Sequence, residues 1–117
     1  MARVVLDTDV LIDHLGGKDA LSSELSGSSY STVTRAELYS WKQDHESIID
    51  RLLDQFDEVS VDRLVAEEAG RIRRELGVRL PDALIAATAI RVKRPLFTRN
   101  VRNYRKIKRL RLHPSDR

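Results

Sequence analysis

The sequence predicts an α/β fold with three layers, in which helices cover both faces of a central, mainly parallel sheet of four to five strands. The run Val4-Val5-Leu6 is apolar and mostly β-branched, which is typical of a strand buried on both faces. Short apolar runs then alternate with helical patterns along the 117 residues, as they do in parallel α/β sheets. A chain of this length is expected to form a single domain, residues 1–117.

The elements after this first strand are bounded by turn and cap residues. Helical patterns are expected at residues 10–15, 19–25, 34–41 and 48–56, and the last of these is amphipathic. Strands are expected at residues 30–33 and 59–61.

The second half of the chain continues the alternation. Asp62 is a suitable N-cap for a helix at residues 65–76, which Gly77 ends. A helix that starts at Pro81-Asp82 and runs to residue 92 is apolar on almost every face, so it should lie against the core of the sheet. The pattern ends with a strand at 96–98, a helix at 101–107 and an edge strand at 110–112.

Composition excludes several classes of protein. The chain has no cysteine, so we expect neither disulfides nor thiolate metal ligands. It has neither an apolar run near the roughly 20 residues of a membrane span nor a signal-peptide pattern. We therefore expect a cytoplasmic protein with no membrane partner. The low aromatic content argues against a broad base-stacking surface.

Charge is distributed unevenly along the chain. Residues 1–90 contain 10 Lys and Arg against 17 Asp and Glu, whereas residues 91–117 contain 11 Lys and Arg against a single Asp. A basic block of this density indicates a polyanion nearby, either nucleic acid or an acidic partner protein. A solvated basic surface is the alternative explanation.

Three acidic residues are candidates for a functional site. Asp7 follows the first strand, Glu37 is expected in the first turn of one helix, and Asp82 in the first turn of another. Each has a structural explanation: a turn for Asp7, a capping box with Thr34 for Glu37, and a helix N-terminus for Asp82. Ligands in open α/β sheets bind at the carboxyl ends of the strands, however, so Asp7 is placed where a metal or phosphate would be bound.

Four motifs in order give the chain a resemblance to a known family. They are Leu6-Asp7-Thr8-Asp9-Val10-Leu11-Ile12, Thr34-Arg35-Ala36-Glu37-Leu38, Pro81 to Ala89, and Thr98-Arg99-Asn100-Val101-Arg102-Asn103-Tyr104. With this order and spacing the chain resembles a PIN domain, and more narrowly the VapC-type toxin ribonucleases, including their FitB-like branch. The resemblance implies an α/β/α sandwich whose acidic pocket binds Mg²⁺ or Mn²⁺ and cleaves RNA, often tRNA or rRNA. It also implies a cognate antitoxin as partner.

The resemblance assigns roles to individual residues. Asp7, Glu37 and Asp82 match the family's first three acidic positions and are the expected metal ligands and catalytic residues. Asn100, also an expected catalytic residue, falls on the fourth acidic position, where an amide replaces the common Asp and makes a second metal ion less expected. If that replacement means that the site has decayed, the chain is instead a non-catalytic module that binds RNA or a partner. Thr8 and Thr98 are expected to support the site and contact the substrate.

Basic and apolar residues suggest partners. Arg99, Arg102 and Arg105 flank the fourth motif and are expected to contact RNA phosphates or an acidic antitoxin segment. The apolar group Tyr39, Trp41 and Ile48 suggests a homodimer interface. A phosphoacceptor receiver domain fits less well, because Arg99 follows Thr98 where a receiver would be expected to have a Lys.

Overall fold

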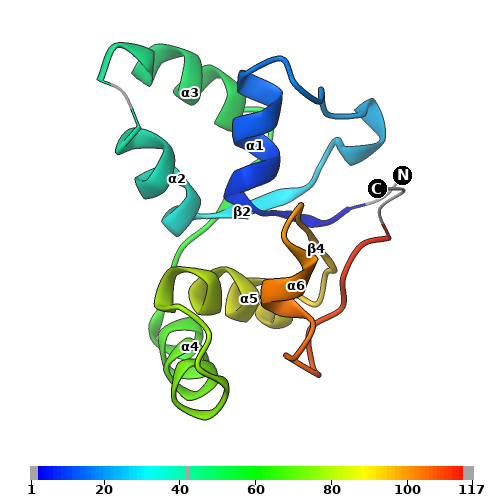
Figure 1. Ribbon diagram of the computed structural model, residues 1–117. Helices are drawn as coiled ribbons and strands as arrows, with labels where there is room; N and C mark the ends of the chain where they lie inside the picture. The colour runs from blue at the N-terminus through cyan, green and yellow to red at the C-terminus, as the bar shows by residue number, and fades with distance from the viewer. Residues whose placement is uncertain (1–2, 42, 115–117) are drawn as a thin grey trace.

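The computed structural model describes residues 3–41 and 43–114 and contains a four-stranded parallel sheet. Its strands are β1 (Val5–Leu6), β2 (Ser29–Ser31), β3 (Asp57–Val59) and β4 (Leu96–Phe97), in the spatial order β3-β2-β1-β4. All three neighbouring pairs are parallel, so the carboxyl ends of the strands meet at one edge of the sheet. The expected three-layer, mainly parallel fold is confirmed (Figure 1).

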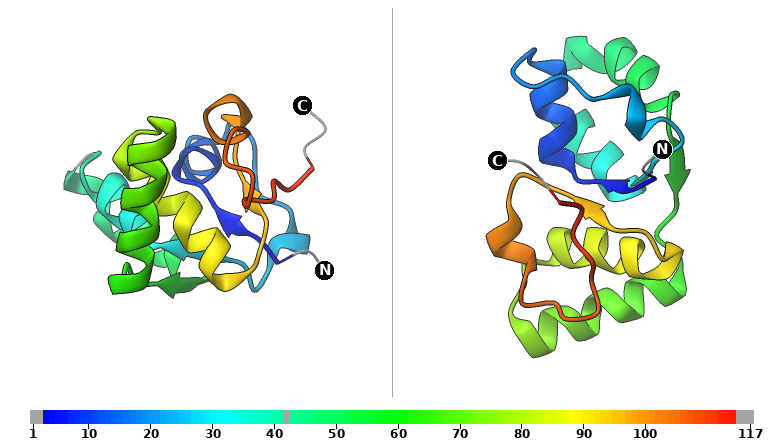
Figure 2. Two further views of the ribbon diagram at one scale, coloured as in Figure 1. Left: turned by 90° about the horizontal axis from the view of Figure 1, so that it is seen from below. Right: turned by 90° about the vertical axis from the view of Figure 1, so that its right-hand side faces the viewer.

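Helices cover both faces of the sheet (Figures 1 and 2). One layer contains α1 (Thr8–Leu15), α2 (Thr32–Tyr39) and α3 (Glu46–Leu53). The other contains α4 (Arg63–Leu76) and α5 (Leu80–Val92), with the short α6 (Val101–Tyr104) beside them. Two single-turn 3₁₀ segments, η1 (Ser23–Leu25) and η2 (Gln43–His45), lie in the connections.

The first strand divides the core between these layers. Val5 packs in the cluster that contains α4 and α5, whereas Val4 and Leu6 pack in the cluster that contains α1, α2 and α3. This alternation follows from the two-residue period of a strand, and all three side chains are fully buried. A continuous apolar run is therefore required, because both faces of β1 are covered.

The caps predicted for α4 are confirmed, whereas α5 starts at Leu80, one residue before the predicted Pro81-Asp82. Oδ1 of Asp62 accepts a hydrogen bond from the Val65 backbone N–H at 2.9 Å, and Gly77 ends α4 with φ of +71°. That left-handed conformation suits glycine, and it turns the chain directly into α5. Six residues of α5 are buried, as expected for a helix that is apolar all round.

Several boundaries differ from those predicted. Strand β2 ends at Ser31, whose side chain caps α2 by accepting from Val33 N–H at 3.0 Å, so α2 starts at Thr32 rather than at Thr34. The prediction of a capping box formed by Thr34 and Glu37 is therefore wrong, and Glu37 lies in the second half of α2. Strand β3 lies at Asp57–Val59 and not at 59–61.

Three short predicted elements are reduced in the structure. The helix expected at 19–25 is only the 3₁₀ turn Ser23–Leu25, and the helix expected at 101–107 ends at Tyr104. The edge strand expected at 110–112 is reduced to an isolated parallel bridge between Leu96 and Leu112. Among the described residues, none of the helices has the length and apolar character needed to cross a membrane.

Candidate active site

Asp7 is placed at the carboxyl end of β1, where it caps the N-terminus of α1. Its Oδ1 accepts from the Thr8 backbone N–H at 2.8 Å, and its Oδ2 accepts from the Thr98 hydroxyl, also at 2.8 Å. Thr98 reaches Asp7 because β1 and β4 are adjacent and in register, with Leu6 paired to Phe97. The carboxylate is thus fixed from two neighbouring strand ends, and the residue is only 6% exposed.

Burial makes the charged form of Asp7 costly. Burial, and after it the negative charge of Asp9, raise the pKa of Asp7 to about 7. Hydrogen bonds from Thr98, Thr8 and Tyr104 act in the opposite direction but do not compensate. The ionised carboxylate therefore needs a nearby cation at neutral pH.

Asp9 adds a second carboxylate to the same strand end. Its Oδ2 accepts from the Arg99 backbone N–H at 3.1 Å, while its Oδ1 is buried without a hydrogen-bond partner. Burial also raises the pKa of Asp9. A buried oxygen without a partner beside a second destabilised carboxylate is an arrangement that a hard cation would stabilise.

Glu37 is connected to Asp7 through Thr8. The Thr8 hydroxyl donates to Oε1 of Glu37 at 2.5 Å and shares a 2.9 Å hydrogen bond with the hydroxyl of Thr34. Thr34 and Glu37 lie three residues apart on one face of α2, and that face is directed to the start of α1. Glu37 is half-buried, with Oε1 fixed by Thr8.

Asp82 is connected to Asp7 through Tyr104. Asp82 lies in the first turn of α5, and its Oδ1 accepts from the Tyr104 hydroxyl at 3.3 Å. The same phenol also lowers the pKa of Asp7. Burial and the charges of both carboxylates hold the pKa of the Tyr104 phenol far above its usual range, so it remains a hydrogen-bond donor.

Thr8 thus connects Asp7 at the end of β1 to Glu37 on α2, through its backbone N–H and its hydroxyl respectively, and Tyr104 lies between Asp7 and Asp82 on α5. In the part of the chain that the structure describes, no three acidic or His side chains approach closely enough to enclose a metal ion by themselves. The carboxylates are joined instead through Thr8, Thr98 and Tyr104. Their oxygens are the ligand type that Mg²⁺ and Mn²⁺ prefer, and Mg²⁺ usually completes its shell with water and substrate phosphate.

Asn100 is connected to Asp7 only through its backbone and Thr98 among the contacts of the described residues. Its backbone N–H donates to the Thr98 hydroxyl at 2.9 Å, but the residue is exposed and its side chain makes no recorded polar contact. Asn103, one turn later, has its side-chain amide 3.5 Å from Oδ2 of Asp82. Sequence reasoning missed Asn103, Tyr104 and Thr34. The helical spacing from Asn100 to Asn103 and Tyr104 was the available signal for the first two.

Arg99 lies against carboxylates of its own chain, and its expected contact with RNA stays a prediction. Its guanidinium lies 2.8 Å from Asp19 and 3.4 Å from Asp13 and stacks 5.0 Å from the Phe97 ring. Arg99 thus connects the segment after β4 to Asp13 of α1 and to Asp19, while its Nε and Nη1 atoms are buried without a hydrogen-bond partner among the described residues. Arg102 and Arg105 are exposed, and of the two only Arg102 lines a pocket with Asp82.

The fold and this acidic site define a class of protein. The PIN domain model matches residues 4–110, and the chain belongs to this family. It is similar to Ribonuclease VapC1 of Methanocaldococcus jannaschii, with 29% identity over 99% of this chain and 89% of that protein.

Solved structures of similar chains share the fold. A chain of a toxin–antitoxin complex from Klebsiella pneumoniae is 28% identical over 92% of this chain and 94% of its own, with a TM-score of 0.80. A chain of DNA-bound VapBC from Salmonella typhimurium is 21% identical over 97% of this chain and 98% of its own, with a TM-score of 0.81. The second likeness is one of fold alone.

Proposed function

We propose that this protein is a metal-dependent endoribonuclease, the VapC-type toxin of a toxin–antitoxin pair, which hydrolyses RNA phosphodiester bonds. The observation that supports this most is the position of Asp7 and Asp82 around the hydroxyl of Tyr104, which donates to Asp82 and lowers the pKa of Asp7. The similarity to Ribonuclease VapC1 and to toxin–antitoxin complexes supports the activity and an antitoxin partner.

The three carboxylates have distinct roles in this proposal. Asp7 and Asp82 hold the divalent ion, Mg²⁺ or Mn²⁺, which when bound polarises the phosphoryl oxygen and lowers the pKa of a bound water. Glu37 orients the attacking water, because Thr8 occupies its Oε1 and leaves Oε2 to accept a hydrogen bond from that water. Thr98 and Tyr104 keep the two ligand carboxylates in place.

A non-catalytic RNA- or partner-binding module is the second candidate. It is favoured by the fourth acidic position, because Asn100 is exposed and has no recorded side-chain contact with the carboxylates. In that case the same acidic edge of the sheet would bind RNA or a partner without cleaving RNA.

A metal-dependence assay separates the two candidates. Purified protein is incubated with a tRNA and rRNA pool in EDTA, and then with Mg²⁺ or Mn²⁺ added back. We expect cleavage only with metal, and expect Asp7→Asn or Asp82→Asn to abolish it. The matched control is Asp54→Asn, which removes an exposed carboxylate outside the site. If the unmodified protein binds RNA but does not cleave it in a metal-dependent way, the proposed enzymatic activity is contradicted and the non-catalytic binding module is favoured.

A further inference from the structure

A pocket opens beside Asp82 that the proposed chemistry does not use. It has a volume of about 270 Å³ and is lined by the turn between α4 and α5, the start of α5 and the segment around α6. We call it the basic notch, defined by Gly77, Val78, Arg79, Asp82, Arg102, Asn103 and Lys106. Three of these residues are cations and one is the candidate metal ligand Asp82.

The turn before α5 brings Arg79 to the notch. Gly77 reverses the chain in a left-handed conformation, and Val78 is buried at 4% exposure, which anchors the turn. Arg79 then stands at the N-cap position of α5, beside the positive end of that 13-residue helix. Sequence reasoning placed the basic residues only in the last part of the chain and did not include Arg79.

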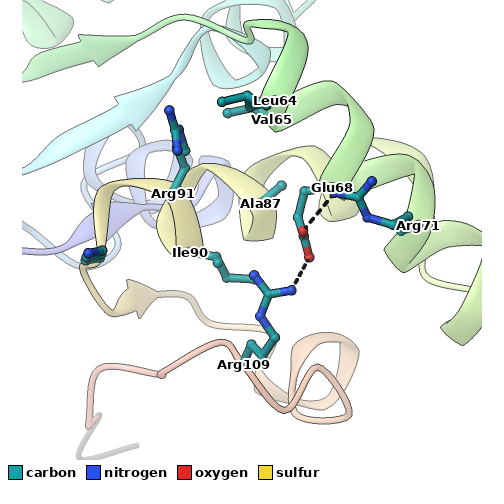
Figure 3. A pocket seen from close by; sticks show the side chains of 9 residues that line it. Leu64, Val65, Glu68, Arg71, Ala87, Ile90, Arg91 and Arg109 are labelled. Carbon is teal, nitrogen blue, oxygen red and sulfur yellow. Dashed lines mark hydrogen bonds and ion pairs between the residues drawn. The ribbon is translucent and has the colours of Figure 1, made fainter.

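The three notch cations are not neutralised within the described part of the chain. Arg79, Arg102 and Lys106 are exposed, and no hydrogen bond or ion pair is recorded for their side chains. Several other members of the basic block, residues 91–117, are already engaged. Arg99 pairs with Asp19, and Figure 3 shows Arg109 paired with Glu68, which Arg71 also contacts. Arg94 and Arg111 donate to backbone carbonyls.

We infer that the basic notch is a subsite for an RNA phosphate next to the one that is cleaved. This inference rests on the proposed function, because the scissile phosphate must reach Asp82. The neighbouring phosphate of the same strand then enters the adjoining pocket, where two arginines and a lysine carry the charges that bind phosphate. An acidic peptide is the alternative ligand for these cations, and the test below separates it from RNA.

The notch holds phosphate without selecting bases. Its lining has no aromatic side chain on which a base could stack. Phosphate contacts position a strand and add affinity, but they do not distinguish sequences. Loss of the notch charges should therefore raise KM and weaken RNA binding at all sequences, while kcat and the cleavage positions stay the same.

The test compares two variants of equal charge. The first is the triple variant Arg79→Gln, Arg102→Gln, Lys106→Gln. The control is Arg63→Gln, Arg91→Gln, Lys108→Gln, which removes three exposed cations that do not line the notch. Binding of a single-stranded RNA oligonucleotide is measured by fluorescence anisotropy between 50 and 300 mM salt, with Asp7→Asn in both proteins to prevent cleavage. Steady-state cleavage is measured with Asp7 intact.

The salt slope is the change in the logarithm of the RNA-binding constant with the logarithm of the salt concentration. We expect its magnitude to be smaller by about 0.7 in the notch variant, which is the contribution of one phosphate on a single strand. Its KM should rise at least fivefold relative to the control, with kcat within twofold. Equal slopes in the two variants would overturn the subsite even if the unmodified protein cleaves RNA. A loss of poly-glutamate binding with unchanged RNA binding would assign the notch to an acidic protein and also overturn it. Absence of cleavage by the unmodified protein would count against the proposed function alone, because the salt slope is measured without cleavage.

Discussion

Tyr104 donates a hydrogen bond to Oδ1 of Asp82 at 3.3 Å, and the same phenol lowers the pKa of Asp7. One buried hydroxyl therefore joins the two carboxylates proposed as metal ligands, although they stand on different elements. Tyr104 is 1% exposed, so its ring belongs to the core while its hydroxyl belongs to the site. This arrangement makes Tyr104 a positioning residue whose two roles can be separated by mutation.

Tyr104→Phe keeps the ring and removes the hydroxyl. We expect kcat to fall about 10- to 100-fold, because misplacement of a reacting group by about 1 Å has an effect of that order. The free energy of unfolding should fall by about 1.5–3 kcal/mol, as for a lost hydrogen bond to a charged group. Steady-state kinetics and urea denaturation measure these changes.

Tyr30→Phe is the matched control for this prediction. Tyr30 is also buried, and its hydroxyl donates to Glu58, outside the site. It should lower stability but leave cleavage unchanged. Equal activity losses in the two variants would assign the effect of Tyr104 to packing.

The pKa of Asp7 predicts an unusual dependence of stability on pH. Its folded value of about 7 lies above the ordinary 3.8, so the folded protein retains this proton in a range where the unfolded chain has lost it. The contribution of Asp7 to stability is therefore fully present below about pH 4 and is lost as pH rises to 7, at about 1.4 kcal/mol per pKa unit. Without metal, Asp7→Asn should match the unmodified protein at pH 4 and exceed its stability at pH 8 by a few kcal/mol.

Denaturation of both proteins in EDTA at pH 4, 6 and 8 measures this difference. The variant removes only one titrating group, so the difference between the two curves isolates Asp7 from Glu58, whose pKa is lowered. Mg²⁺ at pH 8 should stabilise the unmodified protein and not the variant. A difference in stability that stays constant across the pH range would contradict the raised pKa.

Patterns local in sequence predicted the frame of the fold but not all of its boundaries. The apolar run at β1, the Gly77 cap and the apolar α5 each follow from a few adjacent residues, and each is present in the structure. The start of α2 was misplaced because Ser31, Thr32 and Thr34 are all acceptable caps. Ser31 caps the helix, and Thr34 instead contacts Thr8 from another element.

The candidate site likewise combines features that are local in sequence with contacts between distant residues. Asp7, Glu37 and Asp82 were identified from motif order, whereas the hydroxyls that connect them depend on which strands and helices lie side by side. Tyr104 was missed because its partners come from β1 and α5, and nothing in its own four-residue helix indicates them. The ion pairs of Arg99 could not be predicted, because its carboxylate partners, Asp13 and Asp19, are distant from it in sequence.

Arg99 should therefore affect stability and not the salt dependence of RNA binding. Arg99→Gln removes a guanidinium that pairs with Asp13 and Asp19, and we expect the free energy of unfolding to fall by about 1–3 kcal/mol. Arg102→Gln, which loses no recorded contact, should leave stability within about 0.5 kcal/mol. Thermal denaturation measures the stability of the two variants, and the salt slope of RNA binding measures their contribution to RNA contacts. Unchanged stability with a smaller slope for Arg99→Gln would restore Arg99 as an RNA contact.

A homodimer is expected at the surface around Tyr39, Trp41 and Ile48. Trp41 is 42% exposed and Ile48 is 48% exposed, while Tyr39 is half-buried and donates its hydroxyl hydrogen bond to Asp50. Large exposed apolar side chains at neighbouring positions are typical of interfaces. Sedimentation at micromolar concentration should give a dimer, and Ile48→Glu should dissociate it while Leu64→Glu, on the exposed side of α4, should not. A monomer in the unmodified protein would contradict the interface.

The two amides of the fourth motif should respond differently when each is changed to Asp. Asn103 lies 3.5 Å from Asp82 through its side-chain amide, whereas Asn100 is exposed and contacts Thr98 through its backbone only. Asn103→Asp adds a negative charge beside a proposed ligand, so Mn²⁺ should bind about fivefold more tightly, which corresponds to about 1 kcal/mol. Without metal, the two carboxylates repel each other and the variant should be less stable than the unmodified protein.

Asn100→Asp is the control of equal charge, because its side chain lies outside the contacts of the three carboxylates. Its Mn²⁺ affinity should stay within twofold of the unmodified protein. Calorimetric titration of Mn²⁺ into the three proteins, with urea denaturation in EDTA, measures both effects. If Asn100→Asp tightens Mn²⁺ binding and Asn103→Asp does not, Asn100 is the fourth position of the metal site, and its exposed side chain must turn inward when the ion binds.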